Sequence, residues 1–106
     1  MNQADRQRKI NEALSYLRLG NRGHCGCIRL NPQSKGPHND KIIELCKVYL
    51  EMGVPFVTEA IFQNNSRCDI LLPSIFQIVE VLNTETEERF NSKNYPKVFK
   101  ITKVRV

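Results

Sequence analysis

The sequence lacks any hydrophobic run of the length that crosses a membrane. Its apolar stretches end well short of the roughly 20 residues that a transmembrane helix needs. Residues 1–9 are polar and charged, where a secretory signal peptide would need an apolar segment. Repeats and low-complexity tracts are also missing from the 106 residues. We therefore expect one domain without a membrane partner, located in the cytoplasm, or in the host cytoplasm if the gene is viral.

The chain has four cysteines, and their spacing does not suggest a disulfide framework. Cys25 and Cys27 are too close for an easy mutual bridge, while Cys46 and Cys68 fall in predicted regular elements. In a reducing compartment such residues are normally thiols.

The cysteines near residue 25 could instead belong to a zinc site. His24, Cys25 and Cys27, together with His38, offer ligands that zinc accepts. Their spacing matches no standard zinc finger, so we expect a glycine-rich loop without zinc. A zinc-stabilised interaction module is the third of three functional alternatives.

Charge is distributed unevenly along the chain. Residues 1–41 hold eight Lys or Arg and three acids, residues 42–92 hold three and eight, and residues 93–106 hold five and none. An acidic middle between basic ends suits a polyanionic partner, because basic flanks can bind phosphates while the central acids bind a metal.

Hydrophobic periodicity predicts two helices, a three-strand meander, a short helix and a last strand. A period of 3.6 residues indicates the helices, and short runs of β-branched and aromatic residues indicate the strands. Gly20 and Gly53 are expected to end the two long helices, and Asn39 or Asp40 to begin the second. Thr84 and Glu87 form a capping-box pattern for the short helix. The predicted elements are helices 3–19, 39–52 and 85–93, strands 56–62, 67–72, 76–82 and 97–106, and a loop over 20–37. The order from residue 38 onward is αβββαβ, and residues 1–37 add a helix and a Gly- and Pro-containing loop.

Three acids stand on predicted apolar strand faces: Glu59, Asp69 and Glu80. Burying a carboxylate is costly unless something pairs with it. A symmetric turn about Ser74–Ile75 would place Asp69 opposite Glu80, and a turn about Asn64 would place Glu59 opposite Asp69. Three opposed acids are stable only with a cation among them, and carboxylates favour Mg²⁺ or Mn²⁺. The alternative is that the acids lie at strand ends in water, or pair with cations such as Arg67 and Lys47.

These motifs resemble the core of the PD-(D/E)XK nuclease superfamily, which includes archaeal Holliday-junction resolvases and Mrr-type restriction endonucleases. The resemblance covers residues 38–106 and rests on Glu59, on Arg-Cys-Asp-Ile-Leu at 67–71 and on Ile-Val-Glu-Val-Leu at 78–82. It implies a restriction-endonuclease-like α/β fold with a central mixed four-stranded sheet. By the same resemblance, Asp69, Glu80 and the backbone carbonyl of Val81 would bind the metal, with Glu59 as an additional acid.

The activity that the resemblance implies is Mg²⁺- or Mn²⁺-dependent hydrolysis of DNA phosphodiesters, with branched or recombination DNA among the substrates. A homodimer is implied as well, because each strand of a duplex requires one active site.

One position departs from the superfamily pattern. Its motif lysine should stand two residues after the second acid, where this chain has Leu82. Leucine cannot orient water or offset phosphate charge. Lys93 and Lys47 are the candidate substitutes, although each has an ordinary reading as a surface lysine. Without a substitute, the alternative function is nucleic-acid binding without cleavage.

Basic residues near both ends of the chain are candidates for contact with phosphate backbones. The alternatives are a solvated edge strand that charge protects from aggregation, and an N-terminal helix that covers a dimer interface. The nucleic-acid candidates are Arg6, Arg8, Lys9, Arg18, Arg67, Lys97 and Lys100, with Lys103 and Arg105 on the same last strand.

Overall fold

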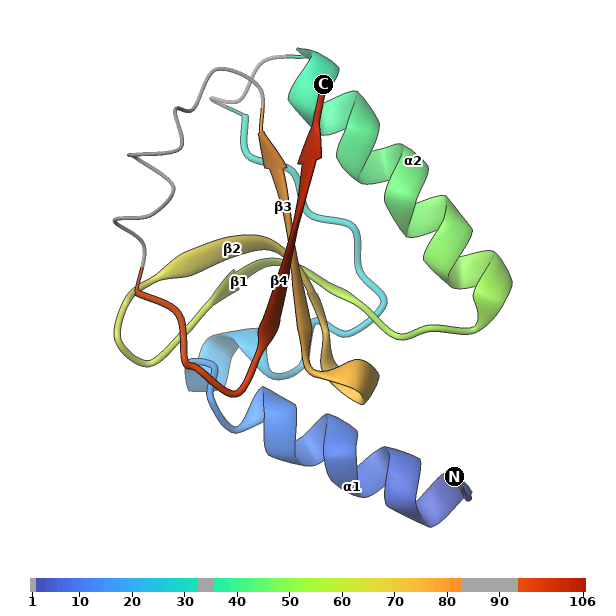
Figure 1. Cartoon of the computed structure of the whole chain (residues 1–106), viewed down its shortest axis with the longest axis vertical. Helices are drawn as coiled ribbons and strands as arrows, with labels where there is room; N and C mark the ends of the chain where they lie inside the picture. The colour runs from blue at the N-terminus through green and yellow to red at the C-terminus, as the bar shows by residue number, and fades with distance from the viewer. Residues whose placement is uncertain (1, 33–35, 83–93) are drawn as a thin grey trace.

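In the described part of the chain, four strands form one mixed sheet in the order β1-β2-β3-β4 (Figure 1). The computed structural model describes residues 2–32, 36–82 and 94–106. β1, β2 and β3 are an antiparallel meander, and β4 runs parallel to β3. This α/β architecture with a mixed sheet and an N-terminal helix agrees with the sequence prediction. The elements are α1 (Gln3–Leu14), the 3-10 turn η1 (Leu19–Asn21), α2 (Gly36–Met52), β1 (Val57–Ile61), β2 (Arg67–Leu72), the 3-10 turn η2 (Pro73–Ile75), β3 (Gln77–Leu82) and β4 (Lys100–Arg105).

Both hairpins have the register that the turn positions predict. Thr58 lies opposite Ile70, and Ile70 lies opposite Val79. Asn65 adopts a left-handed backbone with φ of 73° in the first turn, a conformation that Asn tolerates better than most residues. The second turn is η2, where proline stands in the first turn of the 3-10 helix. Turn chemistry therefore sets the pairing of all three meander strands.

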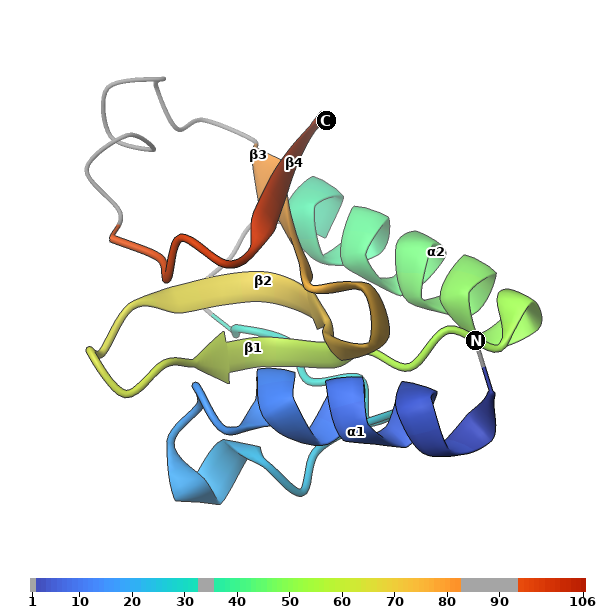
Figure 2. The ribbon, with the colours of Figure 1, turned by 60° about the horizontal axis from the view of Figure 1, so that its bottom comes forward.

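Two hydrophobic clusters cover the two faces of the sheet. α1 contributes to one cluster and α2 to the other, and Figure 2 shows α1 running along β1. Because α1 shares a core with the strands, the N-terminal segment belongs to the same domain. The buried members of the α1-side core are Ala13, Leu17, Val57, Ala60, Phe62, Cys68, Leu71, Ile78, Tyr95 and Phe99. The α2-side core contains Ile42, Cys46, Phe56, Ile70, Leu72, Val79 and Val81.

Helix α1 ends at Leu14, so the prediction of a helix through residue 19 was wrong, as was Gly20 as its stop. The next residues bond to the end of β1 instead: the Arg18 amide donates to the Ile61 carbonyl at 2.9 Å. Leu17 and Phe62 form an antiparallel bridge in which both side chains are buried. Pairing of Leu17 and Arg18 with the end of β1 therefore outweighs continuation of the helix. These contacts join residues far apart in the sequence, so the local pattern could not predict them.

Helix α2 begins at Gly36, three residues before the predicted start, and Asn39 and Asp40 lie inside it. Pro37 is in the first turn, where its missing N–H costs nothing. Gly53 follows the helix with φ of 70°, as a left-handed C-terminal glycine should. Near its C-terminal end, Leu50 is 59% exposed.

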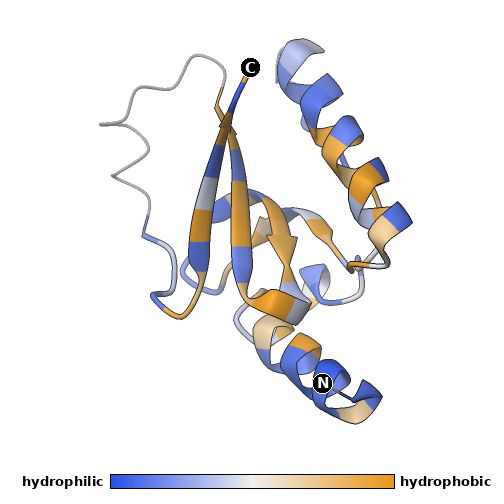
Figure 3. Ribbon diagram, turned by 45° about the vertical axis from the view of Figure 1, so that its right-hand side comes forward, coloured by the Kyte–Doolittle hydropathy of each residue, from blue (hydrophilic) through white to orange (hydrophobic). Residues whose placement is uncertain are grey.

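The C-terminal strand spans Lys100–Arg105, shorter than the predicted 97–106. The Phe99 amide donates to the Pro96 carbonyl at 3.3 Å, so a turn precedes the strand. Figure 3 shows this strand banded in hydrophilic and hydrophobic residues, whereas the N-terminal half of α1 is mainly hydrophilic. The predicted helix 85–93 lies outside the described residues. None of the helices in the described residues is long and apolar enough to span a membrane.

Candidate functional site

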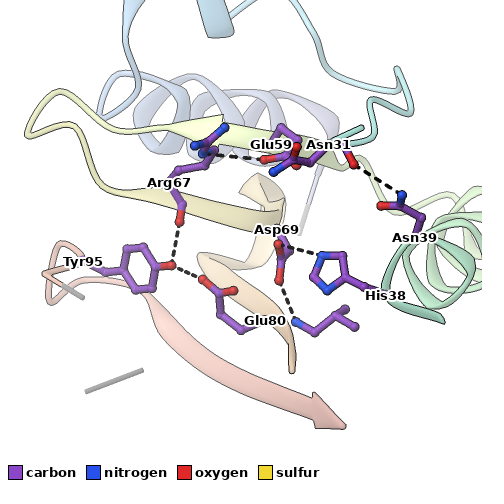
Figure 4. Close-up of polar contacts among 9 residues, drawn as sticks. Asn31, His38, Asn39, Glu59, Arg67, Asp69, Glu80 and Tyr95 are labelled. Carbon is purple, nitrogen blue, oxygen red and sulfur yellow. Dashed lines mark hydrogen bonds and ion pairs between the residues drawn. The ribbon is translucent and has the colours of Figure 1, made fainter. Parts of the chain in front are cut away.

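Asp69 on β2 lies where β2 and β3 stop pairing with each other. The β2–β3 ladder includes Ile70 and Val79, and beyond it the Val81 amide donates to Asp69 Oδ2 at 2.8 Å. His38, in the first turn of α2, places Nε2 3.3 Å from Asp69 Oδ1, as Figure 4 shows. The Asp69 side chain is 17% exposed. A strand, a helix and a backbone amide thus hold this carboxylate in one orientation.

Glu59 on β1 is the second acid of the site. Its φ of 49° is unusual for a residue other than glycine, and it interrupts the β1–β2 ladder between Thr58 and Ala60. Arg67 Nε lies 3.8 Å from Glu59 Oε2. Burial raises the pKa of the Glu59 carboxyl, and the negative charge of Asp69 raises it further, against the opposing cations. The two carboxyls therefore share one partly buried environment.

Glu80 does not join the other two acids, so the predicted row of three is wrong in this part. Its neighbours Val79 and Val81 pack in the α2-side core, and alternation turns Glu80 to the opposite face. There its carboxyl is buried and hydrogen-bonded to the Tyr95 hydroxyl, whose oxygen also lies 2.8 Å from the Arg67 carbonyl oxygen. Figure 4 shows Glu80 turned toward Tyr95 and Asp69 turned toward His38.

The reason is a break in the side-chain alternation of β2. Cys68 packs in the α1-side core and Ile70 in the α2-side core, although two residues apart on a regular strand share a face. Asp69, at the break, contacts His38 of α2, whereas Glu80 on β3 faces the α1-side core. Within residues 2–32, 36–82 and 94–106, no group of three or more His, Cys, Asp or Glu side chains could hold a metal ion. The site is a carboxylate pair, Glu59 and Asp69.

The position of the absent lysine is filled by an apolar side chain. Leu82 is buried, with 1% of its surface exposed. Lys47 is exposed on α2, and Lys93 lies outside the described residues. No structural contact connects Lys47 with the carboxylate pair among the described interactions.

Sequence reasoning missed Arg29, and it considered His38 only as a zinc ligand. Electrostatic interactions with Arg29 and with His38 both lower the pKa of the Glu59 carboxyl, against the larger effect of burial. No spacing signal identifies either one, because they come from a loop and a helix start far from β1 in the sequence. A pocket of about 200 Å³ beside the pair is lined by Arg29, Leu30, Asn31, Pro32, Glu59, Ile61 and Arg67.

The residues considered for zinc have other partners. His24 Nδ1 is 2.6 Å from an Arg29 guanidinium nitrogen, and His38 contacts Asp69. Cys25 and Cys27 are exposed thiols. The two histidines are therefore engaged at the acidic site and its flanking loop.

The predicted nucleic-acid residues lie in three parts of the fold: on and after α1, at and before β4, and on β2. On and after α1, Arg6 donates to the Gly53 carbonyl, Arg8 pairs with Asp5, and Arg18 donates to Asn65. Lys9 is exposed on α1, Lys97 and Lys100 are exposed at and before β4, and Arg67 borders the carboxylate pair.

No family model matches the chain, and neither the curated proteins nor the solved structures contain a match to it.

Replacing Glu59 with glutamine is expected to raise the free energy of unfolding near neutral pH in metal-free buffer. Because burial raises the pKa of Glu59, its charge opposes folding once the pH rises through that pKa. The difference in free energy of unfolding between Glu59→Gln and the wild type should vanish in acid, where Glu59 is protonated in both the folded and the unfolded chain. Urea unfolding at about pH 7 and about pH 3 measures this difference. Glu51→Gln, on the exposed surface of α2, is the control, and a neutral-pH loss in Glu59→Gln would contradict the assignment.

Proposed function

We propose that this chain is a metal-dependent DNA endonuclease with a restriction-endonuclease-like fold. The observation that carries the proposal is the Glu59–Asp69 pair, two partly buried carboxyls on adjacent strands with Val81 backbone beside them. The strand order and the parallel β4 agree with the αβββαβ arrangement that the sequence resemblance implies.

The residues present fit a divalent cation of the Mg²⁺ type. Mg²⁺ is commonly held by one or two carboxylates and keeps several waters, so a pair is a sufficient protein ligand set. Two like charges in a partly buried setting also gain from a cation between them. Glu59 and Asp69 would hold the ion, while Glu80 stays with Tyr95. When bound, such an ion activates water for attack and stabilises charge on the phosphate.

The chain's own side chains then orient the site. The contact of His38 with Asp69 Oδ1 and the Val81 amide at Oδ2 fix the direction of that carboxylate. Arg67, beside Glu59, supplies positive charge where a phosphodiester would approach. We also propose a homodimer, in which each copy cuts one strand.

A second candidate function is nucleic-acid binding without cleavage. The specific observation for it is the buried Leu82 in place of a lysine, together with the Glu80 carboxyl engaged by Tyr95. In this function the basic residues bind the DNA backbone, and the carboxylate pair holds a structural cation.

A nuclease assay separates the two functions. We expect nicking of labelled DNA in Mn²⁺ or Mg²⁺, abolished by EDTA, with duplex, single-strand and four-way-junction substrates compared side by side. Binding of the same DNA without any cleavage would establish the second function. Neither binding nor cleavage of any of these substrates would reject both.

A further inference from the structure

We propose that Arg29 and Arg67 form a phosphate-binding pocket next to the carboxylate pair, and that Arg29 supplies the positive charge missing at Leu82. This inference rests on the proposed DNA-directed function and names the group that receives the backbone phosphate. Both guanidinium-bearing residues line the same pocket of about 200 Å³, with Glu59 in its wall.

The structure holds the backbone at Arg29 firmly although its side chain is exposed. Thr58 on β1 is completely buried, and its hydroxyl accepts a hydrogen bond from the Arg29 amide at 2.6 Å. The same hydroxyl donates to the Cys27 carbonyl at 3.1 Å. A buried threonine whose hydroxyl makes two hydrogen bonds to this loop fixes the loop against the strand that carries Glu59. The position of Arg29 beside the site is therefore a product of the fold.

A second anchor fixes the other end of the same loop. Asn39 on α2 donates from Nδ2 to the Asn31 carbonyl at 3.3 Å. The pocket wall thus spans from β1 to the start of α2, the helix that also presents His38 to Asp69. Figure 4 shows Asn39 reaching Asn31 beside Glu59 and Arg67.

The side chain of Arg29 is oriented by one neighbour. A guanidinium has only donors, so the 2.6 Å contact with His24 means that His24 Nδ1 accepts. Arg67 is 3.8 Å from Glu59 through Nε, and its side chain is 56% exposed. Each guanidinium has further N–H donors, and the planar fork of arginine matches two phosphate oxygens. The pocket has the donors and the charge for one backbone phosphate at the edge of the carboxylate pair.

The test measures DNA affinity in Ca²⁺, with a fluorescein-labelled duplex followed by anisotropy over a range of KCl concentrations. Arg29→Ala is expected to weaken binding about tenfold and to reduce the salt slope by about one. Arg29→Lys keeps the charge but loses the planar fork of arginine. Its DNA affinity should lie between that of the wild type and that of Arg29→Ala. Lys41→Ala removes one positive charge from α2, where Lys41 pairs with Glu44, and serves as the matched control.

A second arm uses inorganic phosphate and follows the arginine side-chain N–H signals by NMR. Phosphate-dependent shifts of Arg29 and Arg67 in the wild type, lost in Arg29→Ala, support the pocket even if DNA is neither bound nor cut. That result would reject the proposed function and retain the phosphate site. Unchanged Arg29 signals in phosphate, together with an Arg29→Ala affinity equal to that of Lys41→Ala, would overturn the inference.

Discussion

Asp69→Asn is expected to lower the rate of Mn²⁺-dependent DNA cleavage by on the order of 100-fold or more. Asparagine has nearly the shape of aspartate, and its carbonyl can still accept from the Val81 amide. The substitution removes the charge that a divalent ion needs and leaves the strand contacts in place. Initial rates on a labelled duplex, with Mn²⁺ affinity from calorimetry, measure the effect.

The control for this prediction is Glu51→Gln, an acid-to-amide change on the exposed side of α2. It should cleave and bind Mn²⁺ as the wild type does. Circular dichroism of Asp69→Asn establishes that the fold is intact. Wild-type Mn²⁺ affinity in a folded Asp69→Asn protein would remove Asp69 from the metal site.

Phe62→Ala is expected to lower the free energy of unfolding by about 3–5 kcal/mol. Phe62 is 1% exposed, and its ring centroid lies 5.7 Å from Tyr95 and 5.6 Å from Phe99. Its backbone also bridges to Leu17 after α1. Phe62 therefore links the end of β1 with Leu17 near the N-terminus and with Tyr95 and Phe99 near the C-terminus. Urea denaturation followed by circular dichroism gives the loss.

Val48→Ala is the matched control, because Val48 on α2 is 43% exposed and should lose less than about 0.5 kcal/mol. A loss in Phe62→Ala below about 1 kcal/mol would show that residues 95–99 do not pack on β1 as described.

Local patterns in the sequence were enough to predict the meander and its pairing. Short apolar runs identify β2 and β3, and turns about Asn64 and about Ser74–Ile75 set both registers. These features depend on residues a few positions apart, which is why they can be predicted without the fold. The missing lysine at Leu82 is visible in the same way.

Helix boundaries depended on partners elsewhere in the chain. Nothing near Leu14 marks a stop, and α1 ends there because Leu17 and Arg18 bond to the end of β1. The early start of α2 has a local cause that was misread, since Pro37 is as suitable for a first helical turn as for a loop.

The site, too, combines features that the local sequence predicts with features that only tertiary contacts decide. From the amino-acid order alone come the four strands, the hairpin registers and the candidacy of Glu59 and Asp69. Only the tertiary structure decided that Glu80 turns to Tyr95 and that Arg29 and His38 join the pair. The physical reason is that register sets which residues are opposite, whereas a break in alternation at Asp69 and a left-handed backbone at Glu59 set the face each side chain takes.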